Sequence, residues 1–329
     1  MNTLKVYGTF GPSCHTKDKI VEMLEYGMGG MRLNLSHVNL EDVKEWMDEF
    51  QQAKMDSGIE AELLIDMQGP EIRLGRLEKP VKLKKGDIID FYSLPIPICI
   101  QPFLKTNQSI LLDDGKIELI MIDEKNAEVL TEGILKSSKS IALPGIQIDS
   151  PTLTDKDIEN LKVCKKFGVT GIMQPFVRNK EDLIEVKKVL HTYDLDFIRV
   201  FAKIENMQGV TSLDSLLPYC DEIIIARGDL GNSTTLPFLP SVQRKIENVC
   251  KKNKKPYMVV TEMLNSMIRK PTPTRAEVND IYYAVYNGAS SIMLTGETAA
   301  GEYPVEAMKM FIDCANVALQ DKKNKTGTI

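Results

Sequence analysis

The chain has 329 residues, a formal charge of −5, 43% hydrophobic residues and 26% charged residues, an ordinary composition for a globular protein. The charges are spread along the sequence, so no basic surface for nucleic acid is indicated. No apolar stretch is long enough to span a bilayer and the N-terminus has no signal-peptide pattern, so we expect a cytoplasmic protein. The length favours a large barrel, or one core with an inserted module.

Several common site chemistries are not indicated. The six cysteines are scattered without a CxxC pair, which is typical of reduced packing residues rather than disulfides or zinc ligands. The three histidines lack the HExxH spacing of zinc hydrolases. There is no GxxxxGK[ST] loop, and no GxGxxG follows a strand. If the protein binds a nucleotide, it does so without a P-loop or a dinucleotide fingerprint.

Short apolar runs alternate with stretches of helical period, which indicates a parallel α/β fold. We expect helices at 18–25, 40–53, 155–167 and 180–191. The expected strands are 5–10, 30–35, 62–67, 170–174, 197–203, 222–226, 256–261 and 290–294. Eight such units favour a (β/α)₈ TIM barrel with its site at the carboxyl ends of the strands. The count alone leaves open a doubly wound sheet.

The third unit is interrupted by a segment without helical period. Strand-like runs and turn signals such as Asp113-Asp114-Gly115 fill this segment, whereas a structureless loop of this length is uncommon in a compact domain. We therefore predict a small β-barrel lid domain at 74–148, inserted after strand 3. The catalytic barrel is expected at 1–73 and 149–329. A module beside a barrel mouth can act as a lid that excludes water.

The second expected strand carries polar residues on one face. Arg32, Asn34 and Ser36 alternate with apolar residues, so they project together. In a barrel this polar set points towards the axis, where an unpaired charge is costly. An amphipathic edge strand with a solvated face is the alternative.

Other strands also carry polar or charged residues at or near their ends. Lys203 and Glu205 lie two residues apart and share a face, which could also be a plain structural ion pair. Asp229 follows an apolar strand between two glycines, where a ligand or only a turn could use it. Asp66 ends the third strand, and Thr261 ends the seventh.

The conjunction of these features favours phosphoryl transfer. Five of the eight strands place a polar or charged residue at the end where barrel enzymes act. Glu205 and Asp229 are hard oxygen ligands suited to Mg²⁺ or Mn²⁺. Lys203 and Arg32 add positive charge for a phosphorylated, acidic substrate. Such chemistry needs positioning and charge neutralisation rather than a nucleophilic serine or cysteine.

These residues resemble the pyruvate kinase family over nearly the whole chain. The motifs that carry the resemblance are 8–13 (GTFGPS), 31–37 (MRLNLSH), 66–73 (DMQGPEIR), 113–115 (DDG), 143–145 (LPG), 203–206 (KIEN), 226–231 (ARGDLG), 261–267 (TEMLNSM), 273–277 (PTRAE) and 294–304 (LTGETAAGEYP). The resemblance implies transfer of a phosphoryl group from phosphoenolpyruvate to ADP, giving pyruvate and ATP. A homo-oligomer through barrel faces is also possible. The spread of charge and the lack of a long apolar stretch indicate no nucleic-acid or membrane partner.

The resemblance implies roles for the substrate residues. Lys203 would neutralise charge on the phosphoryl group and the developing enolate, and Arg32 would contact the phosphoryl group. The main chain around Gly228, with Thr261, would bind the substrate carboxylate. Thr261 would also lie near the route of enolate protonation. Asp229 would contact the substrate through the metal.

The resemblance also implies the cofactors Mg²⁺ or Mn²⁺ and K⁺. Glu205 and Asp229 would hold the divalent ion. The expected K⁺ ligands are Asn34, Ser36, Asp66 and, through its carbonyl, Met67. The expected nucleotide contacts are Asn34, His37, Arg73 and, from the lid, Lys139.

The sequence departs from the family pattern at Gln68, Pro175 and Glu262, where the family usually has lysine, serine and glutamine. The chain ends where the family's C-terminal domain begins, so we expect its effector control to be absent. Two alternatives therefore stand beside an active kinase. One is an impaired paralogue that binds metabolites or regulates, and the other is a metal-dependent lyase or decarboxylase of the pyruvate–enolate barrels.

Overall fold

The computed structural model describes residues 4–36, 38–113, 115–146, 148 and 150–326, and the chain divides into two compact units. The first unit comprises Met1–Gly69, Thr152–Leu230 and Pro237–Ile329. The second comprises Pro70–Pro151 and Gly231–Leu236. The expected domain boundaries, after residue 73 and before residue 149, thus lie inside the second unit, and the contribution of 231–236 to that unit was not expected.

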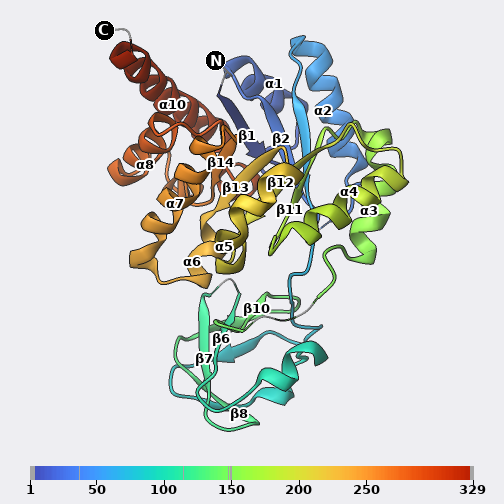
Figure 1. Cartoon of the computed structure of the whole chain (residues 1–329), viewed down its shortest axis with the longest axis vertical. Helices are drawn as coiled ribbons and strands as arrows, with labels where there is room; N and C mark the ends of the chain where they lie inside the picture. The colour runs from blue at the N-terminus through green and yellow to red at the C-terminus, as the bar shows by residue number, and fades with distance from the viewer. Residues whose placement is uncertain (1–3, 37, 114, 147, 149, 327–329) are drawn as a thin grey trace. The chain divides into compact units, whose positions relative to one another are not determined.

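Eight parallel strands of the first unit close into a barrel (Figure 1). In chain order they are β1 (Lys5–Thr9), β2 (Gly30–Asn34), β3 (Glu62–Asp66), β11 (Gly171–Gln174), β12 (Arg199–Ile204), β13 (Glu222–Ala226), β14 (Tyr257–Val260) and β15 (Ser291–Met293). Their order around the barrel is β1-β15-β14-β13-β12-β11-β3-β2. The predicted (β/α)₈ fold is confirmed, and each of the eight expected strands corresponds to one of these.

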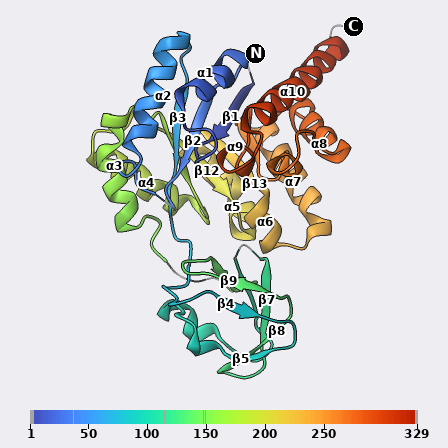
Figure 2. The same ribbon diagram turned by 180° about the vertical axis from the view of Figure 1, so that it is seen from behind.

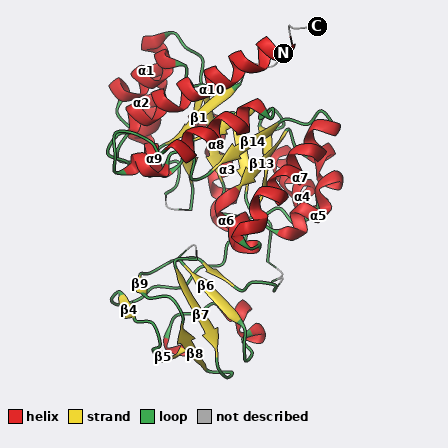
Figure 3. Cartoon of the chain, turned by 90° about the vertical axis from the view of Figure 1, so that its left-hand side faces the viewer, coloured by secondary structure: helices red, strands yellow, loops and turns green. Residues whose placement is uncertain are grey.

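Helices surround the barrel strands, as the red and yellow elements of Figure 3 show. They are α1 (Lys17–Tyr26), α2 (Lys44–Ser57), α3 (Asp155–Phe167), α4 (Lys180–Thr192), α5 (Met207–Leu216), α6 (Arg227–Ser233), α7 (Leu239–Lys252), α8 (Arg275–Tyr286), α9 (Gly296–Ala299) and α10 (Pro304–Thr326). The long α10 packs against α1 and α8, and it is seen from behind in Figure 2. Across the described residues, no helix combines the length and apolar character needed to cross a bilayer.

The inside of the barrel is layered because alternate residues of each strand face inward. A middle layer is apolar and fully buried, with Leu64, Phe201, Ile224 and Met258 among its members. On the strands of Leu64, Phe201 and Ile224, charged residues lie two positions away, namely Glu62, Asp66, Arg199, Lys203 and Glu222. The apolar layer therefore separates a polar group at each end of the barrel, as interior layers do in this fold.

The amino-terminal end of the barrel is closed by an ion-pair network. Arg199 bridges Glu62 and Glu222, with 3.1 Å between its terminal nitrogens and an oxygen of each carboxylate. The hydroxyl of Tyr7 donates to Glu62 over 2.6 Å, and that of Ser291 donates to Glu222. Burial raises the pKa of Glu222, although Ser291 and Arg199 oppose the shift. Polar groups at this end of a barrel serve stability.

The second unit is built from antiparallel strands between β3 and β11. They are β4 (Val81–Leu83), β5 (Ile88–Asp90), β6 (Ser109–Leu112), β7 (Ile117–Met121), β8 (Asn126–Val129), β9 (Gly133–Leu135) and β10 (Ile141–Ala142). Among the described residues they form a five-stranded sheet, β10-β6-β7-β8-β5, and a two-stranded sheet, β4-β9, rather than one closed small barrel. Apolar side chains from both sheets share one core.

We predict that Arg199→Met lowers the free energy of unfolding by roughly 3 kcal/mol, because it leaves Glu222 buried without its cation. The loss should be larger at about pH 8 than at about pH 5. A carboxyl group whose pKa is raised by folding binds more protons in the native state, so stability falls as pH rises. Denaturant unfolding at both pH values measures this, with exposed Arg269→Met as control. An equal loss at both pH values would show that Arg199 does not stabilise the charge of Glu222.

Candidate active site

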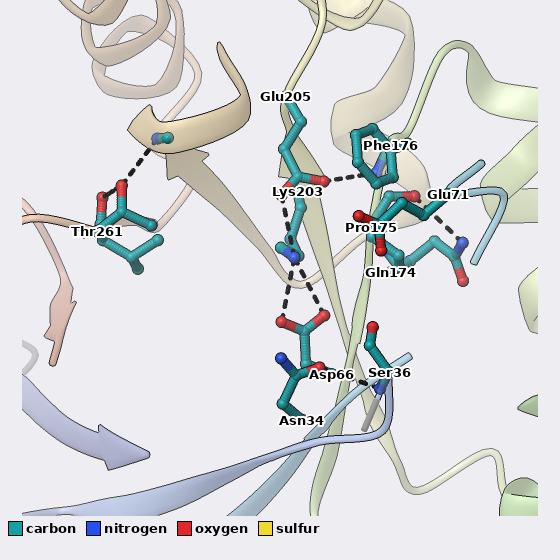
Figure 4. A network of polar contacts seen from close by, with 12 residues as sticks. Asn34, Ser36, Asp66, Glu71, Gln174, Pro175, Phe176, Lys203, Glu205 and Thr261 are labelled. Atoms are coloured by element: carbon teal, nitrogen blue, oxygen red, sulfur yellow. Dashed lines mark hydrogen bonds and ion pairs between the residues drawn. The ribbon is translucent and has the colours of Figure 1, made fainter. Parts of the chain in front are cut away.

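Four alternating charges meet at the carboxyl ends of β2, β3 and β12. The Nη2 atom of Arg32 lies 2.5 Å from Oδ2 of Asp66, and its Nε lies 3.0 Å away. The Nζ atom of Lys203 lies 3.1 Å from both oxygens of Asp66 and 3.0 Å from Oε1 of Glu205 (Figure 4). All four side chains are at most 12% exposed. The charges sum to zero, which allows them to be buried together.

Strand register and alternation bring these residues together. Asn34 of β2 pairs with Asp66 of β3, which aligns the ends of the two strands. Arg32 and Asn34 face the barrel interior, whereas Met31 and Leu33 are fully buried beneath the helices. The polar alternation of the sequence therefore corresponds to an inward-facing polar face rather than a solvated edge strand.

Lys203 is held as a permanent cation. Burial alone would lower the pKa of its ammonium group, but the carboxylates of Asp66 and Glu205 outweigh burial and raise it above its ordinary value. Arg32 lowers the pKa and Asp229 raises it further. Because the pKa stays well above neutrality, Lys203 can supply positive charge to a ligand but cannot act as a general base at neutral pH.

Glu205 is fixed through both of its oxygens. While Oε1 faces Lys203, Oε2 accepts a hydrogen bond from the main-chain N–H of Phe176 over 2.7 Å. Asp229 lies half-buried in the first turn of α6, and its charge acts on Lys203. Within the described part of the chain, no group of three or more histidine, cysteine or acidic side chains is arranged to hold a metal. Two carboxylates nevertheless suit Mg²⁺, which takes few protein ligands and completes its shell with water and substrate oxygens.

Oxygen-bearing side chains surround Asp66. Asn34 and Ser36 lie beside it in Figure 4, and Oδ1 of Asn34 accepts the main-chain N–H of Ser36 over 3.1 Å. Met67 follows Asp66 with its side chain buried, and its N–H donates to the carbonyl of Met173. Amide, hydroxyl and carboxylate oxygens are the donor types that hard cations prefer.

Thr261, the residue after β14, has an unusual backbone conformation. Its φ is 72°, and the φ of Glu262 is 53°, which is costly for a β-branched residue followed by another non-glycine residue. Arg227 supports this turn, because its Nη2 donates to the Thr261 carbonyl over 2.6 Å while Nη1 pairs with Asp280 at 2.5 Å. The main-chain N–H of Gly228 donates to Oγ1 of Thr261 over 2.9 Å. Gly228 and Thr261 therefore sit together at the barrel mouth.

Comparison with known proteins shows which family combines this barrel with this site. The family profile described as "Pyruvate kinase, barrel domain" matches residues 1–95 and 97–308. The chain belongs to the pyruvate kinase family. Three relatives named pyruvate kinase are those of Chlamydia muridarum (35% identical, covering 93% of this chain and 66% of the relative), Geobacillus stearothermophilus (35%, 93% and 55%) and Aeropyrum pernix (36%, 93% and 69%). The chain thus spans about two thirds or less of the length of the first two.

Pro175, one of the three departures from the pyruvate kinase pattern, packs against Gly69. Pro175 lies over Gly69, where a Cβ atom would come 2.4 Å from the proline Cγ, so only glycine fits. Gly69 also has a φ of 59°, which favours glycine on backbone grounds. Gln68, next to it, is half-buried, and Glu262 is exposed. The structure thus assigns Pro175 a packing role and gives no account of Glu262.

Two of the four nucleotide contacts expected from the pyruvate kinase resemblance, Arg73 and Lys139, fall in the second unit. There Arg73 pairs with Glu71 at 2.6 Å, and Lys139 pairs with Asp113 at 2.7 Å. His37, the remaining expected contact apart from Asn34, lies outside the described residues. Both cations are half-buried and held by ion pairs within the unit.

Sequence reasoning gave no role to two well-connected residues. Arg227 directly follows the apolar strand β13. A charged residue at a strand end was the one sequence signal that it contacts Thr261, which follows the neighbouring strand. Asp157 lies in the first turn of α3, three residues after Thr154, and this capping pattern predicts a helix start. Its hydrogen bonds to Gln68 and Gly69 could not be predicted from the local sequence, because these residues lie 89 and 88 positions earlier.

We predict that Arg227→Lys lowers the free energy of unfolding by about 1–2 kcal/mol, because lysine cannot bond Thr261 and Asp280 at once. The control is Arg269→Lys, in an exposed pair with Glu302, which should change stability by less than about 0.5 kcal/mol. Denaturant unfolding compares the two variants. Equal effects would show that Arg227 does not support the turn.

Proposed function

We propose that the chain transfers the phosphoryl group of phosphoenolpyruvate to ADP, with a divalent metal and K⁺. Membership of the pyruvate kinase family supports a function of this kind. The observation that carries the proposal is the buried cluster of Arg32, Asp66, Lys203 and Glu205 at the carboxyl end of the barrel. Phosphoryl transfer needs positioning and charge neutralisation above all, and this cluster provides fixed charges of both signs.

The substrate carries a phosphate and a carboxylate close together. Arg32 and Lys203 would meet the phosphoryl oxygens, since both are fixed cations in a partly dehydrated site. In the reaction the bond between phosphorus and the enol oxygen breaks, and a bond forms between phosphorus and a β-phosphate oxygen of ADP. The enol oxygen is left with negative charge, which Lys203 would stabilise.

Glu205 and Asp229 would hold the divalent ion. Both are hard carboxylates, and Glu205 is locked in place by the Phe176 N–H. When bound, Mg²⁺ or Mn²⁺ neutralises charge on the phosphoester and orients it. Asp229 would therefore contact the substrate only through the metal, whereas Gly228 and Thr261 would bind the carboxylate directly.

The remaining expected residues complete the site. Thr261 would lie on the route by which the enolate carbon receives a proton, giving pyruvate. The oxygens of Asn34, Ser36, Asp66 and the Met67 carbonyl would bind K⁺. The nucleotide phosphates would be bound by Asn34, His37, Arg73 and Lys139, with the second unit acting as a lid.

The impaired paralogue and the lyase remain the competing functions. The paralogue was suggested by Gln68, Pro175 and Glu262, but the charge cluster contains none of these residues. A lyase would not use a nucleotide, so ADP dependence separates it from the kinase.

The test is a coupled assay of pyruvate formation from phosphoenolpyruvate with Mg²⁺ and K⁺, with and without ADP. The kinase predicts pyruvate only when ADP is present. No turnover with ADP rejects the kinase and favours the paralogue. Pyruvate formed from oxaloacetate without nucleotide favours the lyase.

We predict that Lys203→Met reduces turnover by at least about 100-fold while binding of phosphoenolpyruvate changes little, because lysine acts mainly on charge that develops in the transition state. Turnover comes from the coupled assay, and binding from calorimetry with Mg²⁺ present. Exposed Lys252→Met serves as control. An unchanged rate in Lys203→Met would contradict the assigned role.

We predict that Glu205→Gln weakens Mn²⁺ binding by at least roughly tenfold, or about 1.4 kcal/mol. Glutamine keeps an oxygen for the Phe176 N–H but loses the charge that attracts the ion. Paramagnetic titration of Mn²⁺ measures the affinity directly. Half-exposed Glu302→Gln should leave it unchanged, and an unaltered titration in Glu205→Gln removes this residue from the metal site.

A further inference from the structure

The carboxylate of Asp157, in the first turn of α3, is fully buried and accepts four hydrogen bonds. One oxygen accepts the main-chain N–H of Gln68 at 2.7 Å. The other accepts the N–H of Gly69 at 3.0 Å and both the N–H and the hydroxyl of Thr154, at 2.8 and 2.7 Å. A helix cap needs only the Thr154 bonds, so the bonds to Gln68 and Gly69 call for a separate explanation.

These bonds join two of the places where the chain crosses between units, namely the crossing after β3 and the return before α3. Gly69 is the last residue of the first unit before the chain enters the second, and Thr152 is the first residue after it returns. Asp157 holds the outgoing segment directly and the returning segment through Thr154. A single carboxylate therefore fixes both crossings on the barrel side.

Neighbouring side chains fix the same segments. The Nε2 atom of Gln174 donates to the carbonyl of Thr152 over 2.9 Å, and the Thr152 hydroxyl donates to Asp182 over 2.9 Å. Pro175 packs against Gly69. With so many contacts, the crossings have little freedom on the barrel side.

The outgoing segment is continuous with the charge cluster. Asp66, which pairs with Arg32 and Lys203, lies two residues before Gln68. Met67, between them, is anchored on one side by its bond to the Met173 carbonyl. Asp157 supplies the next anchor along the chain, so its loss would allow the main chain at Met67 to move.

We propose that Asp157 is a positioning residue: by binding the Gln68 and Gly69 amides it holds the Asp66–Met67 main chain in the geometry that binds K⁺. The effect on K⁺ binding rests on the proposed function, whereas the anchoring of the Gln68 and Gly69 amides by Asp157 does not. Only an ionised carboxylate can accept from four donors, whereas an asparagine amide would turn an N–H₂ group towards other N–H groups.

The variant to test is Asp157→Asn, with Asp155→Asn as matched control, since Asp155 is an exposed acid in the same helical turn. Hydrogen exchange resolved to single amides is expected to show at least about tenfold faster exchange at Gln68 and Gly69 in Asp157→Asn alone. The K⁺ concentration for half-maximal turnover should rise severalfold in this variant and stay unchanged in the control.

A capping role alone predicts a different pattern. It would lower the melting temperature in Asp157→Asn but leave both amide exchange at Gln68 and Gly69 and K⁺ half-saturation unchanged, and that outcome overturns the proposal. Thr154→Val separates the roles further, because it removes a capping bond while leaving the two amide bonds in place. It should lower stability without shifting K⁺ half-saturation.

The exchange measurement also works without a stable variant or an active enzyme. In the unchanged protein, the amides of Gln68 and Gly69 should be protected despite lying in a loop, and rapid exchange there would refute the proposal. An inactive protein with protected amides would contradict the proposed function instead.

Discussion

The site depends on burying four charges together at the carboxyl end of the barrel. Arg32, Asp66, Lys203 and Glu205 can leave water only because they alternate in sign and satisfy one another. The same mutual pairing keeps Lys203 charged despite its burial. A site that neutralises an anionic phosphoester needs cations that are fixed before the ligand arrives, since flexible ones would reorganise at a cost in rate.

The barrel makes this arrangement possible by dividing its interior into layers. A dry middle layer that includes Phe201 and Ile224 separates the charge cluster from the network around Arg199 at the other end. Each polar group can therefore be satisfied locally. The amino-terminal network stabilises the fold. At the carboxyl end, the loop 175–177 and Arg227 of α6 position the side chains of the site.

Much of the fold followed from local patterns. Strand alternation placed Arg32 and Asn34 on one face, and the eight strand positions were predictable because buried parallel strands are short apolar runs. The ion-pair partner of each charged residue was harder to predict from the sequence. Lys203 binds Asp66 from a strand 137 residues away, so sequence spacing could suggest only its neighbour Glu205. The contacts of Asp157 and Arg227 depend in the same way on tertiary structure.

The central claim is that a metal and a phosphoester meet at this cluster. Anomalous diffraction from crystals grown with Mn²⁺ and phosphoenolpyruvate tests it most directly. The account predicts one manganese ion bound by Glu205 and Asp229, with phosphoester oxygens beside it and facing Lys203. Manganese bound elsewhere on the chain, or phosphoenolpyruvate bound away from Lys203, would contradict it.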